Sequence, residues 1–320
     1  MTPDPRDHVD AIVAQWQRAC PSIDVKPIGI TGRVTRIALY LERDIQHYLQ
    51  RFWLTPSGFE VLLALHAAPA RQLSPTTLAR TRRMSSAGIT GLLDDLASLG
   101  LVTRSPNPLD RRGAVISLTR RGSETLRSAA LGWHAQQVRI SSSLDTVSTD
   151  LLDQLLTGLL RPDDLALNGS RGETSWFLSR LASHINSDAD ALFAPYGISH
   201  GGFQVLASLY RAGPPFRRSP SRVARGLMLS AAGLTGRMAQ LERVGLLRRE
   251  RDPADRRRVI VQLTASGRRL IQRVFPVFVS SHAQMLDPIL EENALAALAG
   301  LLRRVLLDFE SRRPTNRPES

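Results

Sequence analysis

Residues 85–122, SSAGITGLLDDLASLGLVTRSPNPLDRRGAVISLTRRG, are repeated at residues 230–267 as SAAGLTGRMAQLERVGLLRRERDPADRRRVIVQLTASG. Aligned without a gap, the two stretches are identical at 16 of 38 positions, where chance would give about two or three. Upstream, residues 59–62 match residues 203–206 at nearly the same offset. The chain is therefore an internal duplication, and each copy has about the size of a small domain.

The beginning of each copy predicts two helices. In copy one, Pro56 stands near the start of a helix. One apolar face of this helix is predicted from the spacing of Phe59, Leu62, Leu63 and His66. Serine followed by proline then marks the start of a second, short helix, at residues 74–75 in copy one and 219–220 in copy two.

The repeated stretch itself predicts a third helix, a β-hairpin and a fourth helix. The third helix ends at Gly100 or Gly245, because glycine is the usual residue just after a helix. Two segments with the period-two pattern of β-strands, one on each side of an Asp-Arg-Arg turn, then predict a hairpin. The sequence Leu-Thr-x-x-Gly leads into another helix. Long helices are expected before each core, and leucine stripes end each copy. The order of helix, helix, helix, hairpin and helix is that of a winged helix-turn-helix.

Composition excludes several classes of protein. The 320 residues carry 42 Lys or Arg against 29 acids, and Lys26 is the sole lysine. That balance suits a polyanionic partner, although an arginine-rich composition alone is weak support. No phosphate-binding loop, hydrolase elbow or metal-ligand pattern occurs. We expect no enzyme activity, no cofactor and no metal site. The absence of a long apolar run and of a secretory signal predicts a soluble, cytoplasmic protein without membrane contact.

These motifs resemble the MarR family of bacterial transcription regulators. The resemblance rests on Gly100-Leu101-Val102-x-Arg104, on the Asp-Arg-Arg turn at residues 110–112 and on Leu118-Thr119-x2-Gly122. Copy two matches all three, with Gly245-Leu246-Leu247-x-Arg249 for the first. It covers cores at residues 54–127 and 198–273, within domains expected at 1–160 and 161–320. The expected fold class is mainly α with small β-hairpin wings, in two winged helix-turn-helix domains.

The resemblance also implies an assembly. Family members are usually homodimers in which terminal helices form the interface and each subunit binds half of a near-palindromic DNA site. Here two subunits are fused, and each leucine stripe needs a partner surface to bury it. We therefore expect helical dimerisation segments that form an intramolecular pseudo-dimer, so that one chain suffices. Its half-sites should lie about 10 bp apart on double-stranded DNA.

Charge placement favours copy two as the main DNA-binding copy. Residues 203–273 hold 16 arginines and four acids, whereas residues 60–127 hold ten arginines and five acids. The third helix of copy one has no basic residue and carries Asp94 and Asp95 instead. An acid repels phosphate but can accept a hydrogen bond from cytosine. The predicted DNA contacts are Ser85, Ser86, Thr90, Arg111 and Arg112 in copy one, and Ser230, Thr235, Arg237, Arg256, Arg257 and Arg258 in copy two.

Many members of the family are released from DNA by small, often aromatic, ligands. The residues expected to line such an effector site are Trp16, Trp53 and His66 in copy one, and Trp176 and Tyr210 in copy two, with ordinary core packing as the alternative. Cys20 stands alone, so an inert thiol is favoured over a redox sensor. The overall expectation is a sequence-specific, ligand-responsive repressor. The alternative is a ligand-binding or protein-interaction module that keeps the fold with weak or no specific DNA readout.

Overall fold

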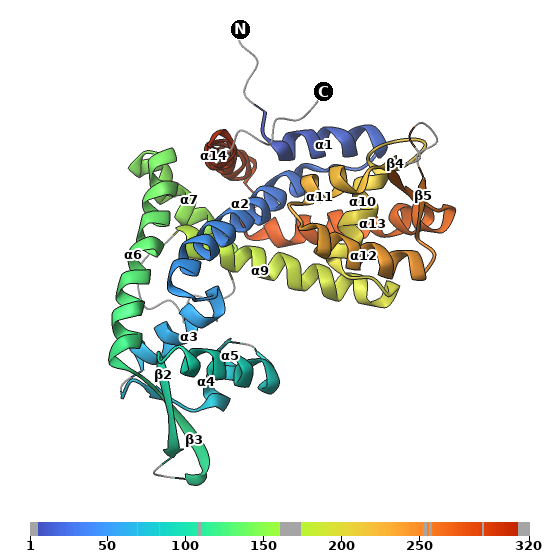
Figure 1. The fold of residues 1–320 in the computed structure, drawn as a ribbon. Coiled ribbons are helices and arrows are strands. Elements are labelled where there is room, and N and C mark those ends of the chain that lie inside the picture. The colour runs from blue at the N-terminus through green and yellow to red at the C-terminus, as the bar shows by residue number, and fades with distance from the viewer. Residues whose placement is uncertain are drawn as a thin grey trace. The chain divides into compact units, whose positions relative to one another are not determined.

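The computed structural model describes residues 6–68, 70–82, 84–107, 110–160, 174–251, 255, 258–289 and 291–312. The chain divides into two compact units. The small unit is Leu39–Ser142, and the large unit joins Met1–Ala38 to Ser143–Ser320. Figure 1 shows the elements of both. The repeat boundary expected at residue 160 concerns the sequence copies and stays a prediction, because the compact units follow a different division.

The small unit is a winged helix. Its helices are α3 (Pro56–Ala67), α4 (Pro75–Arg82), α5 (Ser86–Ser98) and α6 (Arg120–Ser143), and the 3-10 helix η1 (Gln50–Phe52) precedes them. Its antiparallel sheet has the order β1-β3-β2, formed by β1 (Gln72–Leu73), β2 (Val102–Asn107) and β3 (Asp110–Leu118). The hairpin was predicted, whereas the two-residue strand β1 was not, because such a short segment has no readable alternation.

The apolar face predicted for α3 is partly wrong. Phe59 and Leu62 are buried as expected, and Leu65 is buried with them in the core of the small unit. Leu63 is 39% exposed and His66 is exposed. Leu62, Leu63 and Leu65 fall within four positions and cannot all lie on one side of a helix, and packing selects Leu62 and Leu65.

The large unit holds the second winged helix together with helices from both ends of the chain. Its winged helix consists of α10 (His200–Tyr210), β4 (Arg217–Arg218), α11 (Pro220–Leu227), α12 (Ala231–Arg243), β5 (Leu247–Arg251), β6 (Val259–Leu263) and α13 (Ala265–Leu286). The sheet order β4-β6-β5 repeats that of the small unit. The remaining elements are α1 (His8–Ala19), the first part of α2 (Lys26–Leu49), α7 (Thr146–Gly158), α9 (Thr174–Phe193), η2 (Ala194–Tyr196), η3 (Asp287–Ile289) and α14 (Glu292–Ser311).

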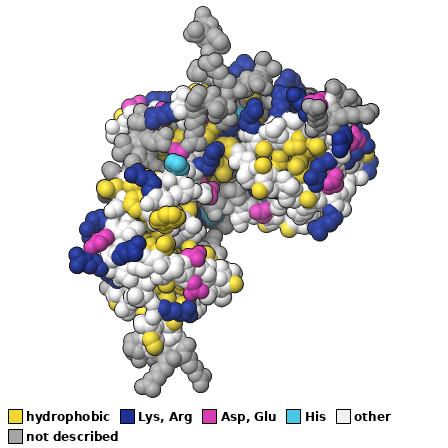
Figure 2. Space-filling view, in the orientation of Figure 1, with side chains coloured by type: hydrophobic (Ala, Val, Ile, Leu, Met, Phe, Trp, Pro, Cys, Tyr) yellow, Lys and Arg dark blue, Asp and Glu magenta, His cyan; other side chains and the backbone are white. Residues whose placement is uncertain are grey.

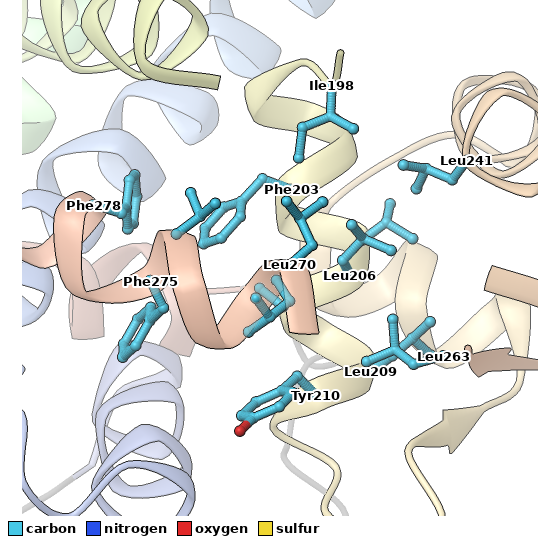
Figure 3. Packing of buried hydrophobic residues seen from close by; sticks show 14 of the residues in the cluster. Ile198, Phe203, Leu206, Leu209, Tyr210, Leu241, Leu263, Leu270, Phe275 and Phe278 are labelled. Carbon is cyan, nitrogen blue, oxygen red and sulfur yellow. The ribbon is translucent and has the colours of Figure 1, made fainter. Parts of the chain in front are cut away.

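One hydrophobic core joins these parts of the large unit. Figure 3 shows Phe203, Phe275 and Phe278 from α10 and α13 around this core. Trp16 of α1 belongs to the same cluster, as do Val25 and Ile28 at the start of α2. Residues of the first sequence copy are therefore buried with the winged helix of the second.

The repeated Leu-Thr-x-x-Gly motif has a structural explanation that is the same in both copies. The hydroxyl of Thr264 accepts a hydrogen bond from the backbone N–H of Gly267 at 3.1 Å and donates one to the carbonyl of Gly245 at 2.7 Å. It thus caps α13 and ties that helix to the chain just after α12. A Cβ at residue 267 would overlap the carbonyl oxygen of Leu246, so only glycine fits there.

Replacing Gly267 by alanine should therefore destabilise the large unit by about 2 kcal/mol or more, because a backbone carbonyl cannot move aside as a side chain can. Gly236→Ala is the matched control, since a Cβ there meets nothing within 4 Å and alanine favours the helix. Thermal unfolding of the full chain should show a lower Tm for the first variant and an equal or higher Tm for the second. Equal effects of the two substitutions would contradict this role of Gly267.

Buried ion pairs join the N-terminal helices of the large unit to its C-terminal helix. Arg33 of α2 binds Asp7 at 2.7 Å and Asp10 at 2.5 Å, and Arg303 of α14 binds Asp10 at 2.6 Å. Arg36 donates to the carbonyl of Gly226, at 3.0 Å, in α11. The leucine stripe of α7 is mostly buried, and α7 contacts both α9 and α14. No described helix is long and apolar enough to cross a bilayer.

Candidate DNA-binding surface and effector sites

The solvent-facing side of the first half of α12 carries small side chains, and we call it the smooth face. Ser230 caps the helix by accepting a hydrogen bond from the N–H of Gly233 at 3.1 Å. Thr235 and Gly236 are exposed one turn further on, and a Cβ at Gly236 would meet only open space. Leu234, Met238 and Leu241 anchor the opposite face in the core. A helix with small residues on its free face can approach a flat or grooved partner closely, as a recognition helix does in the major groove of DNA.

Arginines surround this smooth face. Arg222 and Arg225 are exposed on α11, and Arg243 is exposed in the last turn of α12. In Figure 2, Lys and Arg side chains gather on the part of the surface where Figure 1 places α12 and β5. Arg249 binds Glu242 at 2.8 Å, which ties the wing to α12. This arginine-rich surface beside α12 suits a polyanionic partner.

Two of the predicted DNA contacts in copy two have additional roles in the structure. Arg258 forms an exposed ion pair with Asp255 at 3.1 Å, which DNA phosphates can replace at little cost. Arg237 is half-buried against the start of α10 rather than projecting freely. Arg256 and Arg257 lie outside the described residues.

The corresponding face of α5 in the small unit has a different chemistry. Ser85 caps α5 through the N–H of Gly88 at 3.1 Å, and Thr90 donates back to the carbonyl of Ser86 at 2.8 Å. Asp94 and Asp95 are exposed on the same helix. Arg111 and Arg112 belong to β3, but their side chains lie outside the described part of the structure. The described portion of this surface is therefore acidic where copy two is neutral or basic.

Two aromatic residues predicted from separate copies meet in the large unit. Trp16 is only 2% exposed and stacks on Phe275, with ring centroids 3.6 Å apart. Its ring centroid lies 6.0 Å from that of Tyr210. The sequence assigned Trp16 and Tyr210 to two different effector sites, and the structure places them in one cluster because α1 packs on α10 and α13.

Basic residues surround this aromatic cluster. The guanidinium carbon of Arg211 lies 5.4 Å from the centroid of the Trp16 ring, and the Nε of Arg211 is buried with no hydrogen-bond partner among the described residues. Burial, and then the charge of Arg218, lowers the pKa of Arg211 to about 9. Arg218 itself reaches Gln15 at 3.4 Å. Two neighbouring arginines, one with a buried unpaired nitrogen, give this cluster a positive potential. Sequence patterns could not reveal it, since its members come from three distant segments.

The other predicted effector residues are not part of that cluster. Trp53 is 82% exposed in the small unit, where His66 is also exposed, so neither lines an enclosed site within that unit. Trp176 is half-buried on α9 and meets Phe177 edge-on at 5.6 Å. The binding role assigned to these three residues stays a prediction. Cys20 is half-buried, and burial raises the pKa of its thiol, which makes the thiolate scarcer.

A separate cavity of about 390 Å³ opens between α9 and α13 in the large unit. His184 and His282 line it and are buried, and in the described part of the chain the Nδ1 of His282 has no hydrogen-bond partner. Burial, with a further contribution from His200, lowers the pKa of His282 to about 4, so its ring is neutral at pH 7. The volume of the cavity suits a small organic molecule. Across the described residues, no group of three or more potential ligands is arranged to hold a metal ion.

Two winged helices, one of them with an arginine-flanked third helix, α12, define a helix-turn-helix protein. The family model described as MarR family matches residues 54–113 and 196–258. The chain belongs to the MarR family.

Relatives and a solved structure match about two fifths of the chain. The transcriptional regulator PecS of Dickeya dadantii (strain 3937) is 38% identical over 133 residues, 41% of this chain and 80% of PecS. The transcriptional repressor YetL of Bacillus subtilis (strain 168) is 31% identical, over 43% of this chain and 83% of YetL. The crystal structure of wild-type MarR (apo form) from E. coli aligns with a TM-score of 0.35 at 26% identity, covering 39% of this chain and 93% of MarR.

Proposed function

We propose that this protein is a DNA-binding transcriptional regulator that acts as a single-chain pseudo-dimer. The observation that carries the proposal is the smooth, exposed face of α12 with Arg222, Arg225 and Arg243 around it. Side chains of such a helix contact base edges, while the arginines hold phosphates. The names of PecS and YetL, a transcriptional regulator and a transcriptional repressor, support a role in regulating transcription.

The pseudo-dimer is supported by contacts within the large unit. Helices α1 and α2 from the first copy share ion pairs and a hydrophobic core with α11, α13 and α14 of the second. In a homodimer such contacts would be made between subunits, so the fusion replaces subunit association by an intramolecular contact at high effective concentration.

The DNA site of this pseudo-dimer is asymmetric. The exposed Asp94 and Asp95 of α5 repel phosphates, whereas the equivalent positions in copy two are Ala239 and Gln240. Copy two therefore supplies most of the binding free energy, and copy one adds weak or differently specific contacts. If copy one binds no DNA at all, it keeps the fold as an interaction or ligand-binding module.

The regulator is also proposed to respond to a small planar aromatic anion. Support comes from Arg211, whose Nε lacks a partner beside the ring of Trp16. An anion there would compensate the buried charge, and its ring could stack on the aromatic cluster. Because α1, α10 and β4 all contribute, occupancy would change how α1 is held against the second winged helix.

The DNA-binding proposal is tested by fluorescence anisotropy of the full chain on its own upstream DNA and on a scrambled duplex, between 50 and 300 mM salt. We expect about 10³-fold preference for the upstream fragment at physiological salt, and a steep log–log salt slope. Salt-sensitive binding that does not prefer the upstream fragment over the scrambled duplex would mean that the specific site lies in other DNA. A folded protein that binds neither duplex at 50 mM salt would contradict the proposal.

Effector binding is tested by thermal shift with benzoate as the first probe and neutral benzamide as its matched control. Benzoate at 100 times its Kd should stabilise the protein by about 2.7 kcal/mol, and benzamide should not. Arg211→Met should abolish the benzoate shift while leaving a folded protein, because it removes the unpaired charge. A shift of the same size in Arg211→Met would assign the binding to another site, such as the cavity beside His282.

A further inference from the structure

Gly201, the second residue of α10, lies directly against the side chain of Arg237 from α12. A Cβ built at residue 201 would stand 2.7 Å from the guanidinium carbon of Arg237 and 2.8 Å from its Nη1. The helices α10 and α12 contact each other in the same winged helix, as Figure 1 shows. The guanidinium therefore lies on the backbone of Gly201 in a position that any side chain at residue 201 would obstruct.

Helix charge alone does not explain why Arg237 lies there. The start of a helix carries partial positive charge, which disfavours a nearby cation, although Asp190 brings a carboxylate to this helix start by accepting a hydrogen bond from the N–H of His200 at 2.7 Å. The neighbouring residue is His200, whose pKa falls to about 4 mainly through burial, with Asp190 opposing the shift and Arg237 adding to it. Within the described residues, the structure records no ion pair for Arg237. The guanidinium therefore occupies this place without a direct ion pair, in space that the missing side chain of Gly201 leaves open.

The first copy lacks this arrangement. Its equivalents of Gly201 and Arg237 are Ser57 and Leu92, by the offsets of the repeat. Leu92 is half-buried and packs against the core of the small unit. Glycine and arginine therefore occur together in copy two, and both are missing from copy one, whose α5 has no basic residue.

We propose that Gly201 is a positioning residue for DNA recognition: it lets Arg237 lie flat at the edge of α12, in the orientation in which the guanidinium meets DNA. This inference rests on the proposed function. Arginine loses much side-chain freedom when it binds, and a surface that already orders it reduces that loss. Gly201 itself touches no DNA in this arrangement and acts only through Arg237. The glycine is unfavourable for the helix, since alanine would stabilise α10.

The test is a double-mutant cycle of Gly201→Ala and Arg237→Ala in the full chain, measured by anisotropy on the DNA that the wild type binds. Arg237→Ala should weaken binding about 5- to 100-fold. Gly201→Ala should weaken DNA binding by most of that factor, while its Tm equals or exceeds that of the wild type. The double variant should bind no worse than Arg237→Ala alone. Ser57→Ala, the equivalent change in copy one, should bind as the wild type does.

A second readout does not depend on DNA. Both Gly201→Ala and Arg237→Ala should raise the pKa of His200, followed by NMR of its ring C–H groups, because each moves the guanidinium away. Two results would overturn this role of Gly201 and leave the proposed function standing. One is wild-type affinity in Gly201→Ala together with weak binding by Arg237→Ala. The other is additive losses of affinity in the double variant. A wild type that binds no DNA would overturn the proposed function and, with it, this role of Gly201.

Discussion

Replacing Arg33 by methionine should lower the free energy of unfolding of the large unit by about 3–5 kcal/mol. Arg33 is buried and binds two carboxylates, one of which, on Asp7, has no exposed side-chain surface. Methionine fills similar volume but leaves the charge of Asp7 without its cationic partner, and an unpaired buried charge is costly. The loss should be far larger than that of any surface ion pair.

Arg120→Met is the matched control, because Arg120 pairs with Glu124 across one exposed helical turn at 3.0 Å. Its removal should change the free energy of unfolding by about 0.2–1 kcal/mol. Urea unfolding of the full chain, followed by tryptophan fluorescence, measures both. Similar small losses in the two variants would show that the ion pairs of α1, α2 and α14 do not stabilise the large unit.

Reversing the charge of Arg256 and Arg257 together should weaken DNA binding by about 100-fold or more. These residues follow β5 in the more basic copy, close in sequence to Arg258 and to the wing that Arg249 ties to α12. Glutamate at both positions removes two cations that can bind phosphate or enter a narrow minor groove, and it adds repulsion. The salt slope should also become shallower, since fewer counterions are released.

Arg111→Glu with Arg112→Glu is the matched control in copy one. It should cost less than about fivefold, because the acidic α5 leaves that copy a minor part of the binding free energy. Anisotropy at one fixed salt concentration compares the pairs, and circular dichroism verifies that both variants fold. Equal losses of DNA affinity in the two double variants would refute the asymmetry between the copies and would indicate a symmetric pseudo-dimer.

Most of the fold could be predicted because its signals are local and occur twice. Glycine at positions 100 and 245, and threonine three residues before Gly122 and Gly267, specify helix ends and caps whose geometry the structure repeats in both copies. The strands β1 and β4 were missed because two residues give no alternation. His66 was misplaced because spacing alone cannot choose between two adjacent leucines on α3.

The candidate sites were less predictable, since they depend on contacts between distant segments. Nothing near Trp16 in the sequence indicates that it stacks on Phe275 beside Arg211. Likewise, Arg237 was identified from its place on the third helix, but its contact with Gly201 requires the packing of α12 on α10. Charge composition could be counted from the sequence, whereas the absence of a partner for the Nε of Arg211 could not.

If one chain supplies both halves of a DNA-binding dimer, as we propose, the mass of the protein–DNA complex must correspond to a single chain on each duplex. Light scattering after size-exclusion chromatography, on a duplex that the protein binds specifically, gives the number of chains per duplex. We predict one chain of 35.3 kDa on each duplex, with the free protein also a monomer. Two chains on one duplex at saturation would contradict the pseudo-dimer, because each chain would then supply only one half of the reading surface.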